Sequence, residues 1–458
     1  MESKENTPSD EASKKPSEVE HLTFYEVVAI IQSGDSEQLR EVIEAGRVSD
    51  INMLETMHSF NYYTRSSLLM VACKAGFMEC ARVLLDHNAD INYIAYVDHD
   101  SALKSACFSG SLDILNLIIE RGVVFTDTII LGLFESDEVV CNTEIATILV
   151  EQIQNVNWEE SRGSFLYIAC RAGNVAVVQM LLGRGALFRH GRLDPLVVAS
   201  STTTVLGEHF EVVKLLFEWN TITERVSQER VINAFTSAAK NGKVAVMQYI
   251  IEYGVDANTI TRAMREAVYW HHVDVAAFLL DHDADMYATE PTSKHSPWMC
   301  ACKHGFASTV RMLLARGADP NRLDARGWSP LRQTLLDPAN MVALLDHGAD
   351  PNLLFADGST ALLEVMRLEK STCVRAITVL LEHGADPNLA DAATGETPLM
   401  RAALSRRTNI VKVLLERGAD VTQVDLEGKS VLDMLGDEKY SEVVRLCSQY
   451  VDSKPVLK

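Results

Sequence analysis

Apolar residues recur along this chain with the spacing of short helices, and these helices come in pairs. The first helix of a pair opens at Ser or Thr and carries adjacent small residues, as in Ala72-Cys73 and Ala402-Ala403. Small side chains let neighbouring helices approach closely. The second helix carries apolar residues at i, i+3 and i+4, as in residues 410–415. Because no single pair can bury such a stripe alone, the pattern predicts a stack of helix pairs.

Each pair ends at a helix stop, which is clearest in Leu314–Leu331. There a helix ends at Arg316, Gly317 breaks it, and Ser329-Pro330-Leu331 opens the next helix after an extended segment. Glycine suits the stop because the residue after a helix often adopts the left-handed conformation. Aligned through the chain, the stops are Gly46, Asn88, Gly122, Ile153, Gly185, Trp219, Gly254, Asp283, Gly317, Gly348, Gly384 and Gly418.

Four stops lack glycine. Asn88 and Asp283 are tolerated substitutes, since short polar side chains also adopt the left-handed conformation. Ile153 and Trp219 are poor substitutes. We therefore expect the two units that reach these residues to end in a different way.

Spacing and motif together resemble the ankyrin repeat. The stops recur about every 34 residues, and Thr397-Pro398-Leu399 and Ser329-Pro330-Leu331 match the family's T-P-L opener. The sequence Gly-Ala-Asp-Pro-Asn begins at Gly317, Gly348 and Gly384. The resemblance implies an all-α ankyrin-repeat solenoid, an α-α superhelix with β-turn or hairpin fingers and about 13 repeats. The glycines at the helix stops, which form the corners between repeats, should then lie along one edge of the solenoid.

The resemblance also predicts the domain organisation. Residues 1–21, rich in Ser, Glu, Lys and Pro, are expected to be a disordered tail. Residues 22–451 form the array, with units near 123–160 and 190–230 that match the family least, and residues 452–458 form a C-terminal tail. The histidine of the family's T-P-L-H motif is absent, so its hydrogen bonds must be replaced or lost. The residues in its place are Met70, Lys104, Tyr167, Met299, Arg332 and Met400.

Several connections are longer than the repeat requires. They cover residues 47–65, 136–142, 201–209 and 367–373. Insertions in an array map to loops and often to a functional face, but long loops are also tolerated because closure entropy grows slowly with length. Both interpretations stay open. The last unit, 429–451, has no outgoing finger and is expected to be a terminal cap.

Composition excludes several classes of function. The net charge of -21 argues against a nucleic-acid-binding surface, which would be basic. No apolar run reaches the roughly 18 residues that span a bilayer, and residues 1–20 contain no secretory signal. Nine cysteines without such a signal indicate reduced thiols and a cytoplasmic location, with the nucleus possible. Cys73, Cys107, Cys170 and Cys302 occupy small-residue positions and are expected to be packing residues.

No catalytic or metal motif is present, so we expect no enzyme, no cofactor, no metal and no small-molecule substrate. Four helix-end histidines, His87, His282, His347 and His383, belong to separate units and alternate with arginines at the negative end of the helix dipole. Adjacent His271 and His272 lack the i, i+4 spacing of a helical metal site.

The resemblance implies that the protein binds other proteins. Their binding site is the hollow formed by the finger tips and the first helices. Basic residues and bulky aromatics gather at these positions, and aromatics are favoured interface anchors. We predict an acidic, apolar-anchored partner segment along Lys74, Arg171, Lys240 and Lys303; the alternative is that these residues only solvate their helices. The candidate binding residues are Lys74, Tyr93, Tyr96, Phe108, Arg171, Phe188, Lys240, Tyr269, Trp270, Tyr287, Lys303, Arg322, Arg326, Trp328 and Phe355.

The resulting interpretation is a non-enzymatic scaffold or adaptor that binds proteins, without nucleic acid or membrane insertion. A substrate-recognition subunit of a ubiquitin ligase and a host-targeted effector of a pathogen or symbiont are alternatives. The resemblance also implies that finger asparagines can be hydroxylated, although their ordinary role is to hold the turn. The candidates for this modification are Asn92, Asn321, Asn352 and Asn388.

Overall fold

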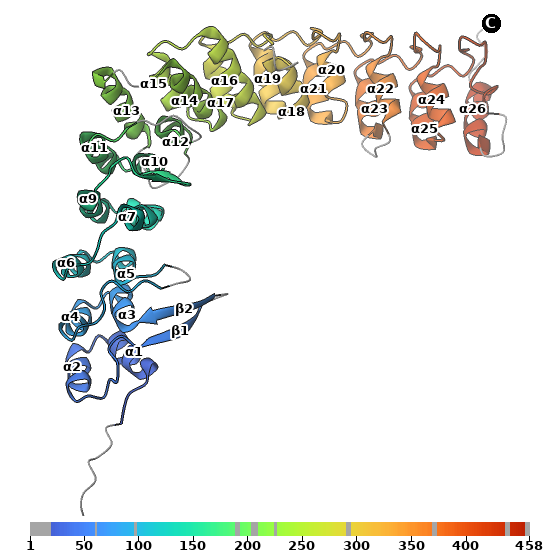
Figure 1. The fold of residues 1–458 in the computed structure, drawn as a ribbon. Helices are drawn as coiled ribbons and strands as arrows, with labels where there is room; N and C mark the ends of the chain where they lie inside the picture. The colour runs from blue at the N-terminus through green and yellow to red at the C-terminus, as the bar shows by residue number, and fades with distance from the viewer. Residues whose placement is uncertain are drawn as a thin grey trace, which may run out of the picture. The chain divides into compact units, whose positions relative to one another are not determined.

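The computed structural model consists of helices in pairs, with little sheet (Figure 1). It forms two compact units, one made of residues 1–199 and 204–219 and the other of residues 200–203 and 220–458. The structure describes residues 20–59, 62–95, 99–187, 193–202, 209–223, 227–289, 295–368, 373–435 and 440–453.

Helix pairs follow one another through the first unit. The first helices and their partners are α1 (Phe24–Ser33) with α2 (Ser36–Glu44), α3 (Leu68–Ala75) with α4 (Met78–Asp86), α5 (Ala102–Ser109) with α6 (Leu112–Glu120), α7 (Asp127–Phe134) with α9 (Thr143–Gln152), and α10 (Phe165–Ala172) with α11 (Val175–Gly183). The helices α12 (Pro195–Ser201) and α13 (His209–Thr223) contribute residues to both units.

The second unit repeats the arrangement. Its pairs are α14 (Gln228–Lys240) with α15 (Val244–Ile251), α16 (Ala257–Tyr269) with α17 (Val273–Leu280), α18 (Pro297–His304) with α19 (Ala307–Ala315), α20 (Pro330–Gln333) with α21 (Pro338–Asp346), α22 (Ala361–Arg367) with α23 (Cys373–Glu382), and α24 (Pro398–Leu404) with α25 (Thr408–Glu416). The helix α26 (Ser441–Ser453) follows the last pair. The count of about 13 repeats stays a prediction, since α26 has no paired first helix in the described residues.

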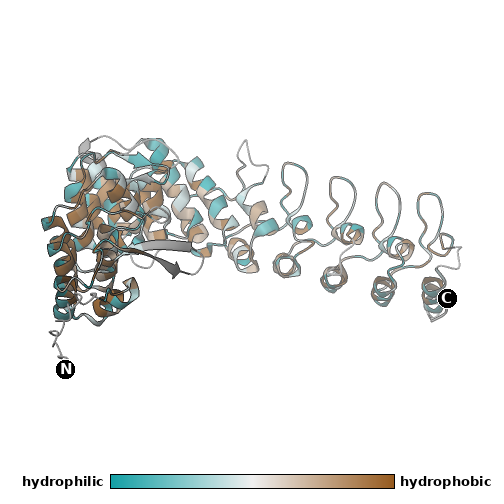
Figure 2. Ribbon diagram, turned by 60° about the horizontal axis from the view of Figure 1, so that its bottom comes forward, coloured by the Kyte–Doolittle hydropathy of each residue, from teal (hydrophilic) through white to brown (hydrophobic). Residues whose placement is uncertain are grey.

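First helices pack on first helices and second helices on second helices, as in α14 on α16 and α19 on α21. The adjacent small residues make this approach possible. Ala72 and Cys73 in α3 and Ala403 in α24 are 0% exposed, as the pattern predicts. Hydrophobic and hydrophilic residues alternate along the helices of both units (Figure 2), because each helix presents one face to the core and another to water.

Helix starts and stops form as the sequence predicts. Ser296 caps α18 and Thr397 caps α24, each accepting the N–H three residues on, with Pro in the first turn. The corner glycines Gly317, Gly348 and Gly384 have φ near +88°. The substitute stops Asn88 (φ 64°) and Asp283 (φ 62°) are also left-handed, whereas Ile153 is extended and Trp219 lies inside α13. The two units that reach Ile153 and Trp219 therefore end differently from the others, as expected.

The missing T-P-L-H histidine is replaced in two repeats by other polar contacts. The thioether of Met400 accepts a hydrogen bond from the Thr397 N–H at 3.4 Å. At the same position two repeats earlier, Arg332 forms ion pairs with Asp357 at 3.1 Å and Glu364 at 3.5 Å. These side chains thus tie the start of a first helix to its own cap or to the next finger.

The finger asparagines link consecutive repeats in the second unit. Asn352 donates from Nδ2 to the Gly384 carbonyl at 3.0 Å and accepts from the Asp386 N–H at 2.8 Å. Asn321 makes the same two contacts with Gly348 and Asp350. Because each amide reaches the next corner, Gly317, Gly348 and Gly384 lie along one edge, which confirms that expectation.

The finger asparagines and the hydrogen bonds that they make to the next repeat form a ladder along the second unit. Removing one of these asparagine side chains should destabilise the unit. Asn352→Ala deletes two hydrogen bonds between repeats, and we expect the free energy of unfolding to fall by about 1–2 kcal/mol. Urea unfolding followed by circular dichroism measures the change. Asn92→Ala is a control for the loss of a single such bond. Among the described contacts, the Asn92 Oδ1 accepts only from the Val124 N–H. Equal effects from the two variants would contradict the ladder's role.

The long connections are not all plain loops. Within 47–65, β1 (Leu54–Ser59) pairs antiparallel with β2 (Tyr62–Ser67), and Leu54 lies opposite Ser67. A second, shorter hairpin joins β3 (Glu159–Glu160) to β4 (Gly163–Ser164). The segment 136–142, predicted as a lengthened turn, contains the one-turn helix α8 (Asp137–Val140). Most of 201–209 and 367–373 lies outside the described residues.

Candidate functional site

Exposed aromatic and cationic side chains gather in the second unit where the first helices α14, α16 and α18 end. These helices lie side by side, α14 against α16 and α16 against α18 (Figure 1). We call this region the α16–α18 surface. It consists of Lys240, Tyr269, Trp270, His271, Lys303, His304 and Phe306.

The rings and cations of this surface contact one another across two repeats. The Lys240 ammonium lies 4.8 Å from the centre of the Trp270 ring. Trp270 meets Tyr269 edge to face at 5.5 Å, and Tyr269 meets the His304 ring at 5.6 Å. Tyr269 and Trp270 are nevertheless 49% and 46% exposed. Such half-exposed aromatics beside cations are what protein interfaces use as anchors.

Phe306 lies against a residue of the preceding repeat, and the glycine before it is extended, whereas the glycine before the equivalent Phe77 is left-handed. In the first unit the equivalent Phe77 lies against Gly34, where an added Cβ would come within 3.0 Å of its ring. In the second unit His271 takes the place of that glycine, with φ 67°. Its imidazole fills the space and contacts the Phe306 ring at 3.8 Å. Phe306 is 60% exposed.

The α16–α18 surface is cationic although the chain is acidic. Lys240 and Lys303 are exposed, and neither forms an ion pair with an acidic side chain of the described residues. Burial, and then the charges of Lys303 and His271, lower the pKa of His304. The surface therefore holds unneutralised positive charge and would attract carboxylates.

The predicted binding residues of the first unit are arranged differently. Lys74 is exposed at the end of α3, and Phe108 is 40% exposed at the end of α5. Arg171 is half-buried, and its guanidinium lies 3.4 Å from the Asp137 carboxylate and 3.2 Å from the Glu135 carbonyl. The inserted helix α8 thus supplies the acid that neutralises Arg171.

The predicted finger residues divide into two small clusters. Arg322 stacks on Tyr287 at 3.9 Å, and the Tyr287 hydroxyl accepts the Asp319 N–H at 2.7 Å. Trp328 lies between two guanidinium groups, those of Arg326 at 5.4 Å and Arg332 at 4.9 Å. These residues remain candidate contacts.

One predicted contact residue must be removed from the set. Phe355 is only 4% exposed, because Arg332 covers its ring at 4.9 Å. It belongs to the packing between fingers, so no partner could reach it. Tyr93 is half-buried on its finger. Tyr96 and Phe188 lie outside the described residues.

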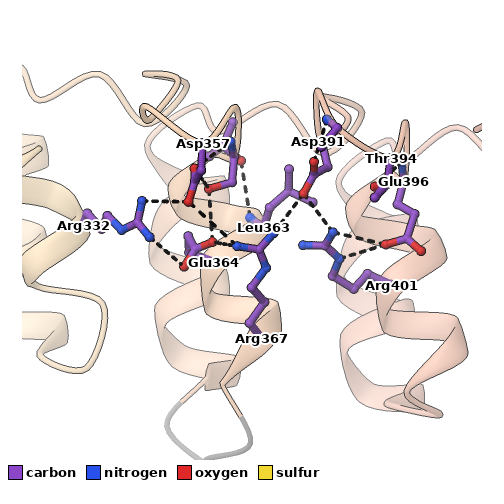
Figure 3. A network of polar contacts seen from close by, with 12 residues as sticks. Arg332, Asp357, Leu363, Glu364, Arg367, Asp391, Thr394, Glu396 and Arg401 are labelled. Carbon is purple, nitrogen blue, oxygen red and sulfur yellow. Dashed lines mark hydrogen bonds and ion pairs between the residues drawn. The ribbon is translucent and has the colours of Figure 1, made fainter. Parts of the chain in front are cut away.

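Next to these fingers, acidic and basic side chains of three consecutive repeats form a network (Figure 3). Asp391, 2% exposed, receives Arg367 at 3.1 Å and Arg401 at 3.0 Å. Arg367 also pairs with Glu364, which in turn pairs with Arg332. The network is satisfied largely from within, which indicates a structural role in joining the repeats.

Sequence reasoning missed His271, His304 and Phe306. A signal for Phe306 was present, since it follows a glycine at the end of a first helix as Phe77 does. That His271 would lie against Phe306 could not be seen, because the two residues meet only when adjacent repeats stack.

In the described part of the chain, no group of three or more His, Cys, Asp or Glu could hold a metal ion. The four helix-end histidines each bind a carbonyl four residues back at 2.8 Å. Burial raises the pKa of the Cys73 and Cys107 thiols to about 12. Among the described helices, none has the length and apolar character needed to cross a bilayer.

Two family models match the chain. The model described as "Ankyrin repeats (3 copies)" matches residues 27–128, 196–290 and 336–425, and that described as "Ankyrin repeat" matches residues 293–325. Together the matches cover more than half of the chain.

Individual relatives share only part of the chain. It is 26% identical over 219 residues to the ankyrin repeat and KH domain-containing protein CBG24701 of Caenorhabditis briggsae, covering 47% of this chain and 7% of that protein. It is 33% identical over 100 residues to cyclin-dependent kinase inhibitor 2A of Monodelphis domestica, covering 21% of this chain and 57% of that protein. A solved ankyrin repeat domain from Acinetobacter baumannii AYE is 28% identical, with a TM-score of 0.36, over 41% of this chain and 98% of that domain.

Proposed function

Because this chain belongs to the ankyrin-repeat family, we propose that it is a non-enzymatic scaffold or adaptor that binds an acidic segment of a partner protein. Ankyrin repeats imply a role in protein–protein interaction, and their stacked units offer an extended surface for it. We place the protein in the cytoplasm, with the nucleus as a second location.

The observation that carries this proposal is the α16–α18 surface. Exposed Tyr269 and Trp270 lie between two exposed lysines, Lys240 and Lys303, that lack acidic partners in the described residues. Lys74 is a further contact position in the first unit. Arg171 contributes less than its position suggests, since Asp137 already neutralises it. An acidic segment complements this charge and places its apolar residues on the rings.

The two alternative roles share this binding step. A substrate-recognition subunit of a ubiquitin ligase and a host-targeted effector would both hold a partner on the same surface. Mass spectrometry of proteins that co-purify with the chain separates them, since ligase subunits would support the first role and host proteins the second.

Charge reversal tests the proposed surface. The double variant Lys240→Glu, Lys303→Glu should weaken partner binding by about tenfold or more and flatten its salt dependence, because two attractive charges become repulsive. Partners captured by the wild-type chain are first identified by mass spectrometry, and the affinity of each purified partner is then measured at several salt concentrations.

The control is Lys429→Glu, a charge reversal of an exposed lysine in the same unit that pairs only with Glu427. It should leave the affinity unchanged. Partners that bind the double variant and the wild type with equal affinity and equal salt dependence would overturn the proposal.

A further inference from the structure

We propose that the α16–α18 surface binds an acidic segment carrying a bulky apolar anchor, and that binding is coupled to proton uptake at His304. The inference rests on the proposed function and adds to it the size of the anchor, the rings that receive it and a dependence on pH.

The aromatic rings argue for the anchor. Tyr269, Trp270 and Phe306 each expose about half of their surface or more, and two of them meet edge to face. A purely acidic segment would leave this apolar area in water. An aromatic or aliphatic side chain laid on it gains roughly 25 cal/mol for each Å² removed from water. Apolar contact and charge complementarity together therefore select an anchored acidic segment.

Cations outnumber acids on the elements that form this surface and pack beside it. The charged or titratable side chains are Arg265 and Glu266 of α16, Lys240 of α14, Lys243 after it, His272 and Asp274 around the start of α17, Lys303 of α18, Arg311 of α19 and Asp337 before α21. Asp337 is already engaged in capping α21 and in holding Asn340. The His304 imidazole thus lies in a positive environment, which opposes its protonation in the free chain.

A bound carboxylate reverses that balance. Burial, Lys303 and His271 lower the pKa of His304 in the free chain, so the ring is neutral near pH 7.5. Carboxylates of a bound segment would favour the protonated ring and raise its pKa. A group whose pKa is raised on binding takes up a proton, so affinity rises as pH falls through the histidine range.

Synthetic peptides test the two parts of the proposal. The probes are fluorescein-labelled peptides of about 12 residues, rich in glutamate, with Trp, Leu or Ala at the centre. We expect the Trp and Leu peptides to bind the full chain about tenfold more tightly than the Ala peptide, because a larger apolar side chain removes more apolar surface from water. We expect each to bind about threefold to tenfold more tightly at pH 5.5 than at pH 8, since one unit of pKa shift is tenfold in affinity. Fluorescence anisotropy gives both ratios.

Variants assign the effects to residues. Trp270→Ala and Phe306→Ala should remove the preference for an anchored peptide, whereas Tyr253→Ala, an exposed tyrosine after α15, should keep it. His304→Gln should bind as the wild type does at pH 8 but lose much of the gain at pH 5.5. His282→Gln is its control, because His282 lies just after α17 and contacts the Phe278 carbonyl of that helix. Circular dichroism at each pH checks that every variant stays folded.

The outcomes separate the anchor, the proton coupling and the proposed function. Equal binding of the Trp, Leu and Ala peptides would overturn the anchor, and an affinity independent of pH in the wild type would overturn the proton coupling. Either result would leave the proposed function standing if captured partners still depend on Lys240 and Lys303. Failure of all acidic peptides, together with partner binding that ignores those lysines, would overturn the proposed function as well.

Discussion

Asp391→Ala is expected to lower the free energy of unfolding of the second unit by about 3 kcal/mol, since removing one partner of a buried ion pair leaves the other uncompensated. Asp391 is 2% exposed and accepts from Arg367, Arg401 and the Ala393 N–H. Arg401, 13% exposed, would keep only its pair with Glu396. Loss of Asp391 therefore leaves buried positive charge between two repeats (Figure 3).

The effect should depend on pH. Burial alone would raise the pKa of Asp391, but hydrogen bonds from Ala393 and Arg401 and the charges of both arginines outweigh it and lower this pKa. A carboxyl with a lowered pKa contributes stability above its unfolded value of about 3.9, and this contribution is lost as pH falls through the folded value. The difference in stability between the wild type and Asp391→Asn should thus be largest near pH 7 and shrink toward pH 3.

Denaturant unfolding, monitored by hydrogen exchange of the amides in α22 to α25, tests this prediction. The matched control is Glu382→Ala, which breaks the exposed pair of Glu382 with Arg417 at 3.2 Å. Exposed pairs contribute about 0–1 kcal/mol, so the control should change stability little. A similar small effect of Asp391→Ala would show that the network does not hold the repeats together.

Gly395→Ala is expected to destabilise the same unit by about 2–4 kcal/mol, which combines backbone strain with a steric clash. Gly395 has φ +76°, a conformation that costs alanine roughly 1–2 kcal/mol. An added Cβ would also lie 2.6 Å from the Leu426 backbone nitrogen, in the next finger. Backbone cannot give way as a flexible side chain can, so the two fingers would have to separate.

Gly428 provides a close control for this variant. It occupies the equivalent turn of the following finger with the same φ of +76°, and nothing lies within 4 Å of a Cβ built on it. Gly428→Ala should therefore cost only the backbone strain. The difference between the two variants, measured by urea unfolding, isolates the contact between fingers. Equal costs would mean that the fingers do not depend on this close approach.

The positions of some candidate residues in the repeat could be predicted from the sequence. The sequence placed Lys240, Tyr269, Trp270 and Lys303 at the ends of first helices, because their positions after the small residues are fixed within one repeat. Whether the binding role holds stays a proposal. Burial of Phe355 and neutralisation of Arg171 could not be foreseen, since each depends on a residue about 23 to 34 positions away, Arg332 and Asp137.

By itself, the sequence determined the paired helices, their caps and their left-handed stops, because these follow from preferences within a few residues: a hydroxyl at the start, glycine, Asn or Asp at the end. The tertiary structure alone decided which side chains of different repeats meet. Stacking brings residues some 30 positions apart into contact, as where the His271 ring of one repeat lies against the Phe306 ring of the next. That contact is long-range in sequence, so no local pattern specifies it.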